Sequence, residues 1–127
     1  MLWTLANALA CARYHNLLHR NADIVEIANR SNLSNSFCSG IIQTDNHRLY
    51  CTPTYYAQKL YATLAGQRSL KVEPAGGFHD PLDVSATLTA QADALVLFAV
   101  NDSLTAINRE IDISDCSLGT GARKCTM

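Results

Sequence analysis

The chain has 127 residues, of which 48% are hydrophobic, and its formal net charge is −1. This length and composition allow the packed core of one ordinary domain and argue against intrinsic disorder. The 10 basic and 11 acidic residues form no basic stripe or acidic tail, so neither nucleic acid nor a charged membrane surface is indicated as a partner. No run approaches the ~18 apolar residues of a membrane-spanning helix.

Two segments have the spacing of amphipathic helices. The first covers residues 2–20, where two basic residues close the last turn. Its predicted apolar stripe comprises Leu2, Leu5, Leu9, Ala12, Leu17 and Leu18. The second begins at Thr52, an expected N-cap, continues with Pro53 at the first helical position and ends at Gly66, an expected C-cap. Its predicted apolar face comprises Tyr56, Leu60 and Leu64, flanked by Ala57 and Tyr61.

The stretch between these helices predicts a strand followed by a long loop. Residues 24–28 are a compact β-branched run, which is typical of a strand. A helix, a short turn and an apolar strand together indicate an α/β unit with a parallel sheet. Residues 29–50 are polar and irregular, and they occupy the place where an α/β barrel carries its functional loops.

From residue 69 onward the pattern changes to short alternating runs. Strands are predicted at residues 69–73, 84–89, 95–100 and 107–113, with turns at 90–93 and 101–105 and a loop over 74–81. Such regular spacing favours an antiparallel β-sandwich. The boundary between the α/β piece and the all-β piece falls near residues 66–69. Because one strand cannot form a barrel and so few strands rarely form a sandwich, both pieces are expected to be incomplete.

Four motifs give the chain a resemblance to family-51 α-L-arabinofuranosidases. They are residues 20–25 (RNADIV), 27–35 (IANRSNLSN), 52–56 (TPTYY) and 95–101 (LVLFAVN). Their order and spacing resemble the end of these enzymes up to about residue 113. The resemblance implies that residues 1–66 are the last α/β unit of a catalytic (β/α)8 barrel. It also implies that residues 67–127 are part of a C-terminal antiparallel β-sandwich.

The resemblance implies hydrolysis of terminal non-reducing α-L-arabinofuranosyl residues in arabinan or arabinoxylan, by a retaining mechanism that uses two glutamates. In the family these glutamates occur in Asn-Glu and Glu-Trp pairs upstream of the matched region. Neither pair is present here, and Glu26, Glu73 and Glu110 match neither position. We therefore expect no catalytic residue in this chain and no hydrolysis by the chain alone. The alternative is a non-catalytic β-sandwich module that stabilises a barrel or binds carbohydrate or a partner.

Three residues are candidate substrate contacts by resemblance. Asn32 stands where the family has a glutamine near the sugar, and it keeps the amide on a side chain one methylene shorter. Asn35 matches a family asparagine and could instead order the loop through its own amide. Tyr50 matches a position where an aromatic is common; it could stack on a furanose ring or anchor the loop. An arabinose-containing polysaccharide or oligosaccharide and a homo-oligomeric parent are implied, and no cofactor is expected.

Other candidate sites have weaker support in the sequence. His15 and His19 are four residues apart on a predicted helix, but they lack the Glu of H-E-x-x-H and a third ligand. We therefore expect surface or helix-end histidines and no metal. Glu26 is expected at a strand edge, paired with Arg13 or Arg30, and not to be a catalytic acid.

The cysteines and the tail carry no recognisable motif. The chain has five cysteines, an odd number, and no C-x-x-C occurs. We expect unpaired thiols and no disulfide framework. Residues 115–127 match no strand of the family.

Overall fold

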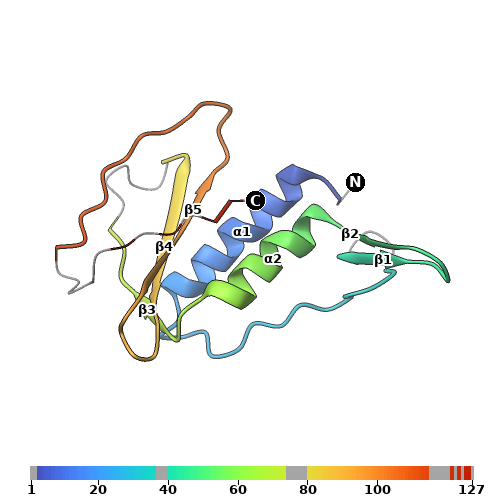
Figure 1. Ribbon diagram of the computed structural model, residues 1–127, viewed down its shortest axis with the longest axis horizontal. Helices are drawn as coiled ribbons and strands as arrows, with labels where there is room; N and C mark the ends of the chain where they lie inside the picture. The colour runs from blue at the N-terminus through green and yellow to red at the C-terminus, as the bar shows by residue number, and fades with distance from the viewer. Residues whose placement is uncertain are drawn as a thin grey trace.

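The computed structural model describes residues 3–36, 40–73, 80–114, 121, 123, 125 and 126. Its elements are α1 (Leu5–Arg20), β1 (Ile42–Thr44), β2 (Leu49–Cys51), α2 (Pro53–Leu64), β3 (Arg68–Leu70), β4 (Leu82–Leu88) and β5 (Leu95–Asn101). β1 and β2 form an antiparallel hairpin, and β3, β4 and β5 form a second antiparallel sheet in that order. The helix pair lies between the two sheets (Figure 1). The described chain is therefore a small mixed domain.

Both predicted helices are confirmed, and each begins at a threonine N-cap. Thr4 Oγ1 accepts the Asn7 N–H at 3.3 Å, so α1 begins later than the predicted residue 2. Thr52 Oγ1 accepts the Tyr55 N–H at 3.4 Å at the start of α2, as predicted. The predicted proline at the first helical position of α2 is also present.

The predicted apolar faces of the two helices are confirmed only in part. Leu5 on α1 is 59% exposed, and Tyr56 on α2 is 51% exposed. The buried positions are Ala8, Ala12 and Asn16 on α1 and Thr54, Ala57 and Tyr61 on α2. Ala12, Ala57 and Tyr61 among them were predicted, as part of the first stripe and as the flanks of the second face. Most of these side chains are small, which lets the two helices approach closely. Close packing, in addition to side-chain hydrophobicity, therefore decides which face is buried.

The prediction that Gly66 caps α2 is also wrong. The helix ends at Leu64, and Ala65 is its C-cap. Gly66 lies against the end of β4, where its N–H donates to Thr87 Oγ1 at 2.8 Å. A Cβ on Gly66 would collide with the carbonyl group of Leu88, so glycine is needed for this close approach.

The two helices run parallel, side by side. Asn7 Nδ2 donates to Thr54 Oγ1 at 3.0 Å near the start of both helices. Further along, Tyr61 Oη donates to Asn16 Oδ1 at 2.6 Å. Because both helices point the same way, residues 21–36 must run back along their length before β1 begins (Figure 1).

The strand predicted at residues 24–28 is wrong. In the part of the chain that the structure describes, no segment pairs with these residues, and Ile24 and Ile27 are 77% and 74% exposed. A strand forms only where a neighbour satisfies its backbone groups, whatever its side-chain pattern. The predicted parallel sheet is likewise not found among the described residues, where the parallel contact is an isolated bridge between Ser34 and Ile42.

The predicted loop at residues 29–50 contains the β1–β2 hairpin, which the sequence did not indicate. Its strands are three residues long and mixed in polarity, so they lack the alternation that marks a longer strand. Asp45 holds the turn, because its carboxylate accepts the N–H groups of His47 at 2.7 Å and Arg48 at 2.6 Å. These hydrogen bonds hold the pKa of Asp45 below its usual value.

Three of the four strands predicted after residue 66 are confirmed with small shifts. Residues 84–89 and 95–100 correspond to β4 and β5, and residues 69–73 to the shorter β3. The fourth, at residues 107–113, is wrong: the segment alternates in hydrophobicity, but it is extended chain without a paired neighbour among the described residues. The turn at 90–93 is confirmed, while most of the predicted loop at 74–81 lies outside the described residues.

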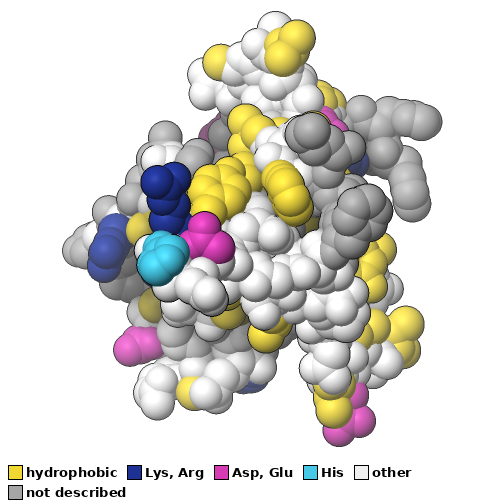
Figure 2. Space-filling view, turned by 90° about the vertical axis from the view of Figure 1, so that its right-hand side faces the viewer, with side chains coloured by type: hydrophobic (Ala, Val, Ile, Leu, Met, Phe, Trp, Pro, Cys, Tyr) yellow, Lys and Arg dark blue, Asp and Glu magenta, His cyan; other side chains and the backbone are white. Residues whose placement is uncertain are grey.

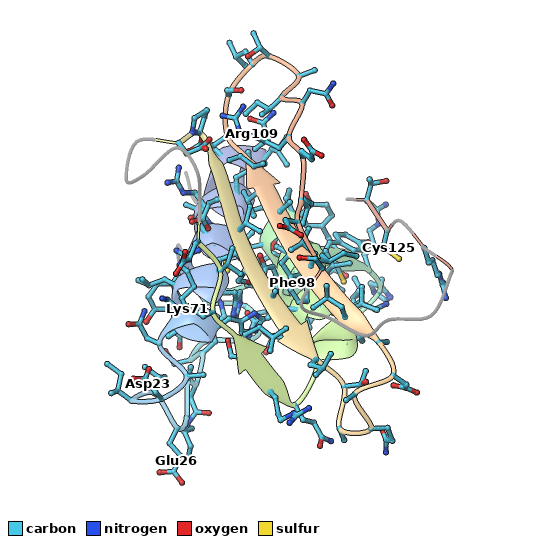
Figure 3. The ribbon with its side chains drawn as sticks, turned by 90° about the vertical axis from the view of Figure 1, so that its left-hand side faces the viewer. Asp23, Glu26, Lys71, Phe98, Arg109 and Cys125 are labelled. Atoms are coloured by element: carbon cyan, nitrogen blue, oxygen red, sulfur yellow. The ribbon has the colours of Figure 1, made fainter. Side chains whose placement is uncertain are left out.

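Aromatic rings form the core between the helices and the larger sheet. Its buried cluster comprises Ala12, Tyr61, Phe98 and Val100. Phe98 lies near the middle of the sheet (Figure 3), and its ring stacks on that of Tyr61 with centroids 4.2 Å apart. His15 also stacks on Tyr61, at 4.9 Å, and His19 packs against Phe98 at 5.3 Å. Both histidines therefore face the core, although His19 does lie at the helix end as predicted.

A buried polar cluster joins α1, α2 and β4. Asn16 is 0% exposed and uses all its hydrogen-bonding capacity. Its Nδ2 donates to the Asp83 carbonyl at 3.1 Å and carboxylate at 2.8 Å. Its Oδ1 accepts the hydroxyls of Tyr61 at 2.6 Å and Ser85 at 2.8 Å. Because Ser85 gives its hydrogen to Asn16, the 3.1 Å contact with His19 requires the proton on His19 Nδ1.

The half-buried His15 and His19 make stability depend on pH. Burial lowers the pKa of His15, and the charges of His19 and Arg30 lower it further; burial also lowers the pKa of His19. Both rings therefore bind a proton less readily in the folded protein than in the unfolded chain, where the ordinary pKa is 6.5. Their contribution to stability is therefore fully present above that pH and is lost as the pH falls below it.

We expect the urea midpoint to fall between about pH 7.5 and about pH 5. A His15→Gln/His19→Gln double variant should show a flatter dependence over the same range. A midpoint that rises on acidification would contradict the lowered pKa values of both rings.

Candidate functional site

The structure brings the three predicted contact residues to one end of the molecule. The N–H groups of Ile41 and Ile42 donate to the Leu33 carbonyl at 3.1 and 2.9 Å, and the Asn35 N–H donates to the Ile42 carbonyl at 3.0 Å. Residues 33–35 thus border one edge of β1, while β2 borders the other. Asn32 and Asn35 lie on the first of these borders, and Tyr50 lies on β2.

Asn32 and Asn35 share an unusual backbone conformation. Their φ angles are 61° and 47°, in the left-handed region that asparagine tolerates better than most residues. Asn35 Oδ1 accepts the Thr44 N–H at 2.8 Å. The amide of Asn35 therefore orders the loop, which is one of the two roles considered for it from sequence. The Asn32 side chain is exposed.

An Asn35→Ala variant tests this ordering role. It removes the acceptor for Thr44 and places alanine at positive φ, so we expect a loss of about 1.5–3 kcal/mol in the local opening free energy of the hairpin. Amide hydrogen exchange at Thr44 measures it directly. Asn35→Gly is the matched control, because it loses the acceptor without the backbone strain and should lose about 0.5–1.5 kcal/mol. Unchanged Thr44 protection in both variants would contradict the assignment.

Gly40 supports the same loop, although nothing in the sequence pattern indicated it. A Cβ there would lie 2.8 Å from the Ser36 nitrogen and 2.8 Å from Gln43 Nε2. Gln43 Nε2 donates to the Gly40 carbonyl at 2.9 Å. The turn is therefore too tight for a side chain at residue 40. The sequence feature that could have indicated this tight turn is the single glycine within the polar stretch of residues 29–50.

Tyr50 lies in a shallow surface pocket. The pocket has a volume of about 480 Å³ and is lined by Leu49, Tyr50, Cys51, Pro53 and Tyr56. Tyr50 is 54% exposed, so it is not the partly buried loop anchor considered as an alternative. Figure 2 looks onto this end of the molecule, where hydrophobic side chains reach the surface beside a few charged ones. Tyr56 was predicted to face the core and was missed as a pocket residue.

The pocket is uncharged, and the glutamates lie elsewhere. Glu26, Glu73 and Glu110 are all exposed. Glu73 pairs with Lys71 at 2.6 Å. Glu26 points away from the body of the molecule (Figure 3), so its predicted strand-edge position is wrong. Arg13, one of its two predicted partners, instead forms an ion pair with Asp102.

Metal and disulfide chemistry find no support in the described parts of the chain. No group of three or more potential ligands is found among the described residues, and His15 and His19 are engaged with aromatic rings. Cys11, Cys51 and Cys125 are free thiols, as predicted, and burial raises the pKa of Cys11. Cys38 and Cys116 lie outside the described residues.

The described chain is thus a small mixed α/β domain with a neutral, aromatic-lined pocket beside two asparagines. Over residues 2–112 it matches the family of alpha-L-arabinofuranosidase C-terminal domains, and it belongs to that family. This confirms the resemblance seen in the sequence, and it implies an arabinose-containing substrate for a parent enzyme. No curated protein and no solved structure matches the chain. Within the described residues, neither helix is long and apolar enough to span a membrane.

Proposed function

We propose that the chain is the C-terminal part of an enzyme that hydrolyses terminal non-reducing α-L-arabinofuranosyl residues in arabinan or arabinoxylan. The observation that carries this proposal is the family match over residues 2–112. A retaining mechanism needs two carboxyl groups about 5–5.5 Å apart. The pocket is lined by no carboxylate and the glutamates are exposed, so both catalytic glutamates are assigned to sequence outside this chain.

Residues 1–66 are proposed as the end of the catalytic (β/α)8 barrel. Parallel helices joined by a returning extended segment are the arrangement of two successive helices in such a barrel. The exposed side chains of Ile24 and Ile27 lie on this returning segment, where neighbouring barrel strands would cover them.

Residues 67–127 are proposed as part of a β-sandwich. The face of β4 and β5 that carries Ser85 and Phe98 packs on the helices. The opposite face presents the cross-strand pairs Val84–Ala99, Ala86–Leu97 and Leu88–Leu95. These residues are all apolar, as expected of a face that a second sheet covers.

Asn32, Asn35 and Tyr50 are proposed to lie at the substrate-facing edge of the parent enzyme. In a (β/α)8 barrel, the loops between a strand and the next helix surround the active site. The segment from residue 29 to the start of α2 is such a loop in the proposed arrangement. Asn32 would present its amide to the sugar and Tyr50 its ring, while Asn35 would hold the loop in place. The parent is also proposed to be a homo-oligomer.

An assay of the 127-residue chain on an aryl α-L-arabinofuranoside tests whether the catalytic glutamates lie outside this chain. We expect no turnover, because no described pocket holds a carboxylate pair. Retardation of the chain in native gels that contain arabinan is expected if the substrate-facing edge is formed. Clear turnover would contradict the assignment of both glutamates to sequence outside the chain.

A non-catalytic module is the second candidate function. The buried cluster around Asn16 supports it, because that cluster ties the sheet to the helices through three elements. In this role the sheet stabilises the helices of the barrel and binds carbohydrate or a partner on its own. Arabinan binding without any effect of the chain on a parent enzyme would favour this candidate.

A further inference from the structure

A second pocket continues the first along the exposed face of α2. It has a volume of about 420 Å³ and is lined by Tyr56, Lys59, Leu60, Thr63 and Thr126. Tyr56 belongs to both pockets. Residues 56, 60 and 63 recur at helical spacing and lie opposite the buried face of α2. The two pockets therefore form one track that runs from the hairpin along the helix.

Two tyrosine rings mark the hairpin end of this track. Tyr50 is 54% exposed and Tyr56 is 51% exposed, so both present large ring surfaces to solvent. Tyr55 packs edge-to-face against Tyr56, with centroids 5.3 Å apart and an interplanar angle of 87°. This contact already restricts the Tyr56 ring in the free protein. Binding of a ligand to the ring therefore costs little further side-chain entropy.

The nearly uncharged lining of the track indicates which kind of ligand it can bind. The first pocket has no ionisable acid or base other than its tyrosines and Cys51, and Lys59 is the cation lining the second. Such a lining offers a strong ionic partner neither to a polyanion nor to a polycation. Aromatic rings with hydroxyl groups at their edges suit a neutral, polyhydroxylated ligand that has apolar C–H faces. Each pocket also lies within the roughly 300–1,000 Å³ typical of small-ligand sites.

We propose that this track, from Tyr50 across Tyr56 to Thr63, is a non-catalytic binding site for a neutral pentose polysaccharide. The site lies beside the loop that carries Asn32 and Asn35, so a polymer held there would extend past the proposed substrate-facing edge. The choice of an arabinose-containing polymer rests on the proposed function. The neutral, ring-stacking character of the site rests on the pocket alone.

Affinity electrophoresis of the 127-residue chain tests the site. The gels contain linear arabinan, hydroxyethylcellulose or polygalacturonate, and Tyr50→Ala and Tyr56→Ala are compared with Tyr14→Ala. Tyr14 is a matched control, because it is 58% exposed on α1 and lines neither pocket. We expect arabinan to retard the chain and the two track variants each to bind about 3- to 10-fold more weakly. Tyr14→Ala and the ring-preserving Tyr56→Phe should bind as the unaltered chain does.

The outcomes separate the two proposals. Track variants that bind arabinan as tightly as Tyr14→Ala, with equal urea midpoints, would overturn the track and the proposed sugar contact of Tyr50. The proposal that the chain is part of an arabinofuranosidase would still stand, because it rests on the family match. Tyrosine-dependent retardation by hydroxyethylcellulose, but not by arabinan, would retain a neutral-sugar track and contradict the arabinose substrate. Retardation by none of the three polymers, or by polygalacturonate alone, would overturn the track.

Discussion

An Asn16→Ala variant is expected to lose about 3–4 kcal/mol of unfolding free energy. The alanine would leave the hydroxyls of Tyr61 and Ser85 without their shared acceptor and Asp83 without its amide donor. Each buried group that loses its partner costs roughly 1–3 kcal/mol. The carboxylate of Asp83 keeps its ion pair with Arg20 at 2.9 Å, which limits the loss on that side.

Urea denaturation followed by circular dichroism measures the Asn16 effect. Tyr61→Phe removes a single hydroxyl from the same cluster and should cost only about 1–1.5 kcal/mol. Asn108→Ala is an exposed control on the same residue type and should change stability by less than about 0.5 kcal/mol. An Asn16→Ala effect no larger than that of Asn108→Ala would show that the cluster does not couple the helices to the sheet.

Phe98→Ala is expected to destabilise the domain by about 3–5 kcal/mol. Phe98 is 4% exposed, stacks on Tyr61 and packs edge-on against His19. The truncation removes these contacts and leaves a cavity between β5 and both helices, where the rigid sheet can collapse only partly. The loss should also raise the exposure of both partner rings.

The matched control for Phe98→Ala is Leu104→Ala. Leu104 is fully solvent-exposed, so its truncation should change the unfolding free energy by less than about 0.5 kcal/mol. Thermal or urea unfolding of both variants gives the comparison. Equal stability of Phe98→Ala and the unaltered chain would contradict the placement of the core between the sheet and the helix pair.

The parts of the fold that local chemistry determines were predictable from the sequence. Thr52 and Pro53 marked the start of α2 because a capping side chain and a fixed φ act within one turn. The runs at 84–89 and 95–100 indicated β4 and β5 because the first alternates apolar and polar residues and the second is a continuous apolar run.

The parts that depend on tertiary partners were not predictable in the same way. Residues 24–28 and 107–113 have the composition of strands, but pairing decides whether a strand forms. The buried faces of the helices were predicted only in part, because close approach selects small residues such as Ala8 and Thr54, which hydrophobicity ranks below leucine. Asn16 is a polar residue at the centre of the interface. Nothing in the sequence indicated which groups satisfy its hydrogen bonds.

The candidate site was predicted in part. Resemblance selected Asn32, Asn35 and Tyr50, and the structure brings all three to the hairpin end. The resemblance did not select Tyr56 as a site residue, because the helical spacing of Tyr56 suggested a core position. The tight turn at Gly40 also went unnoticed, because it depends on backbone segments that meet only in the folded chain.

The returning segment between the helices has a consequence for handling the protein. It presents Ile24, at the end of a turn, and Ile27, on the chain that follows, with no strand partner among the described residues. Such an open, apolar edge is a template for pairing with the same segment of another molecule, which is how edge-to-edge aggregation begins. The separately expressed chain is therefore expected to self-associate as its concentration rises, and charged substitutions such as Ile24→Lys and Ile27→Lys should delay that association.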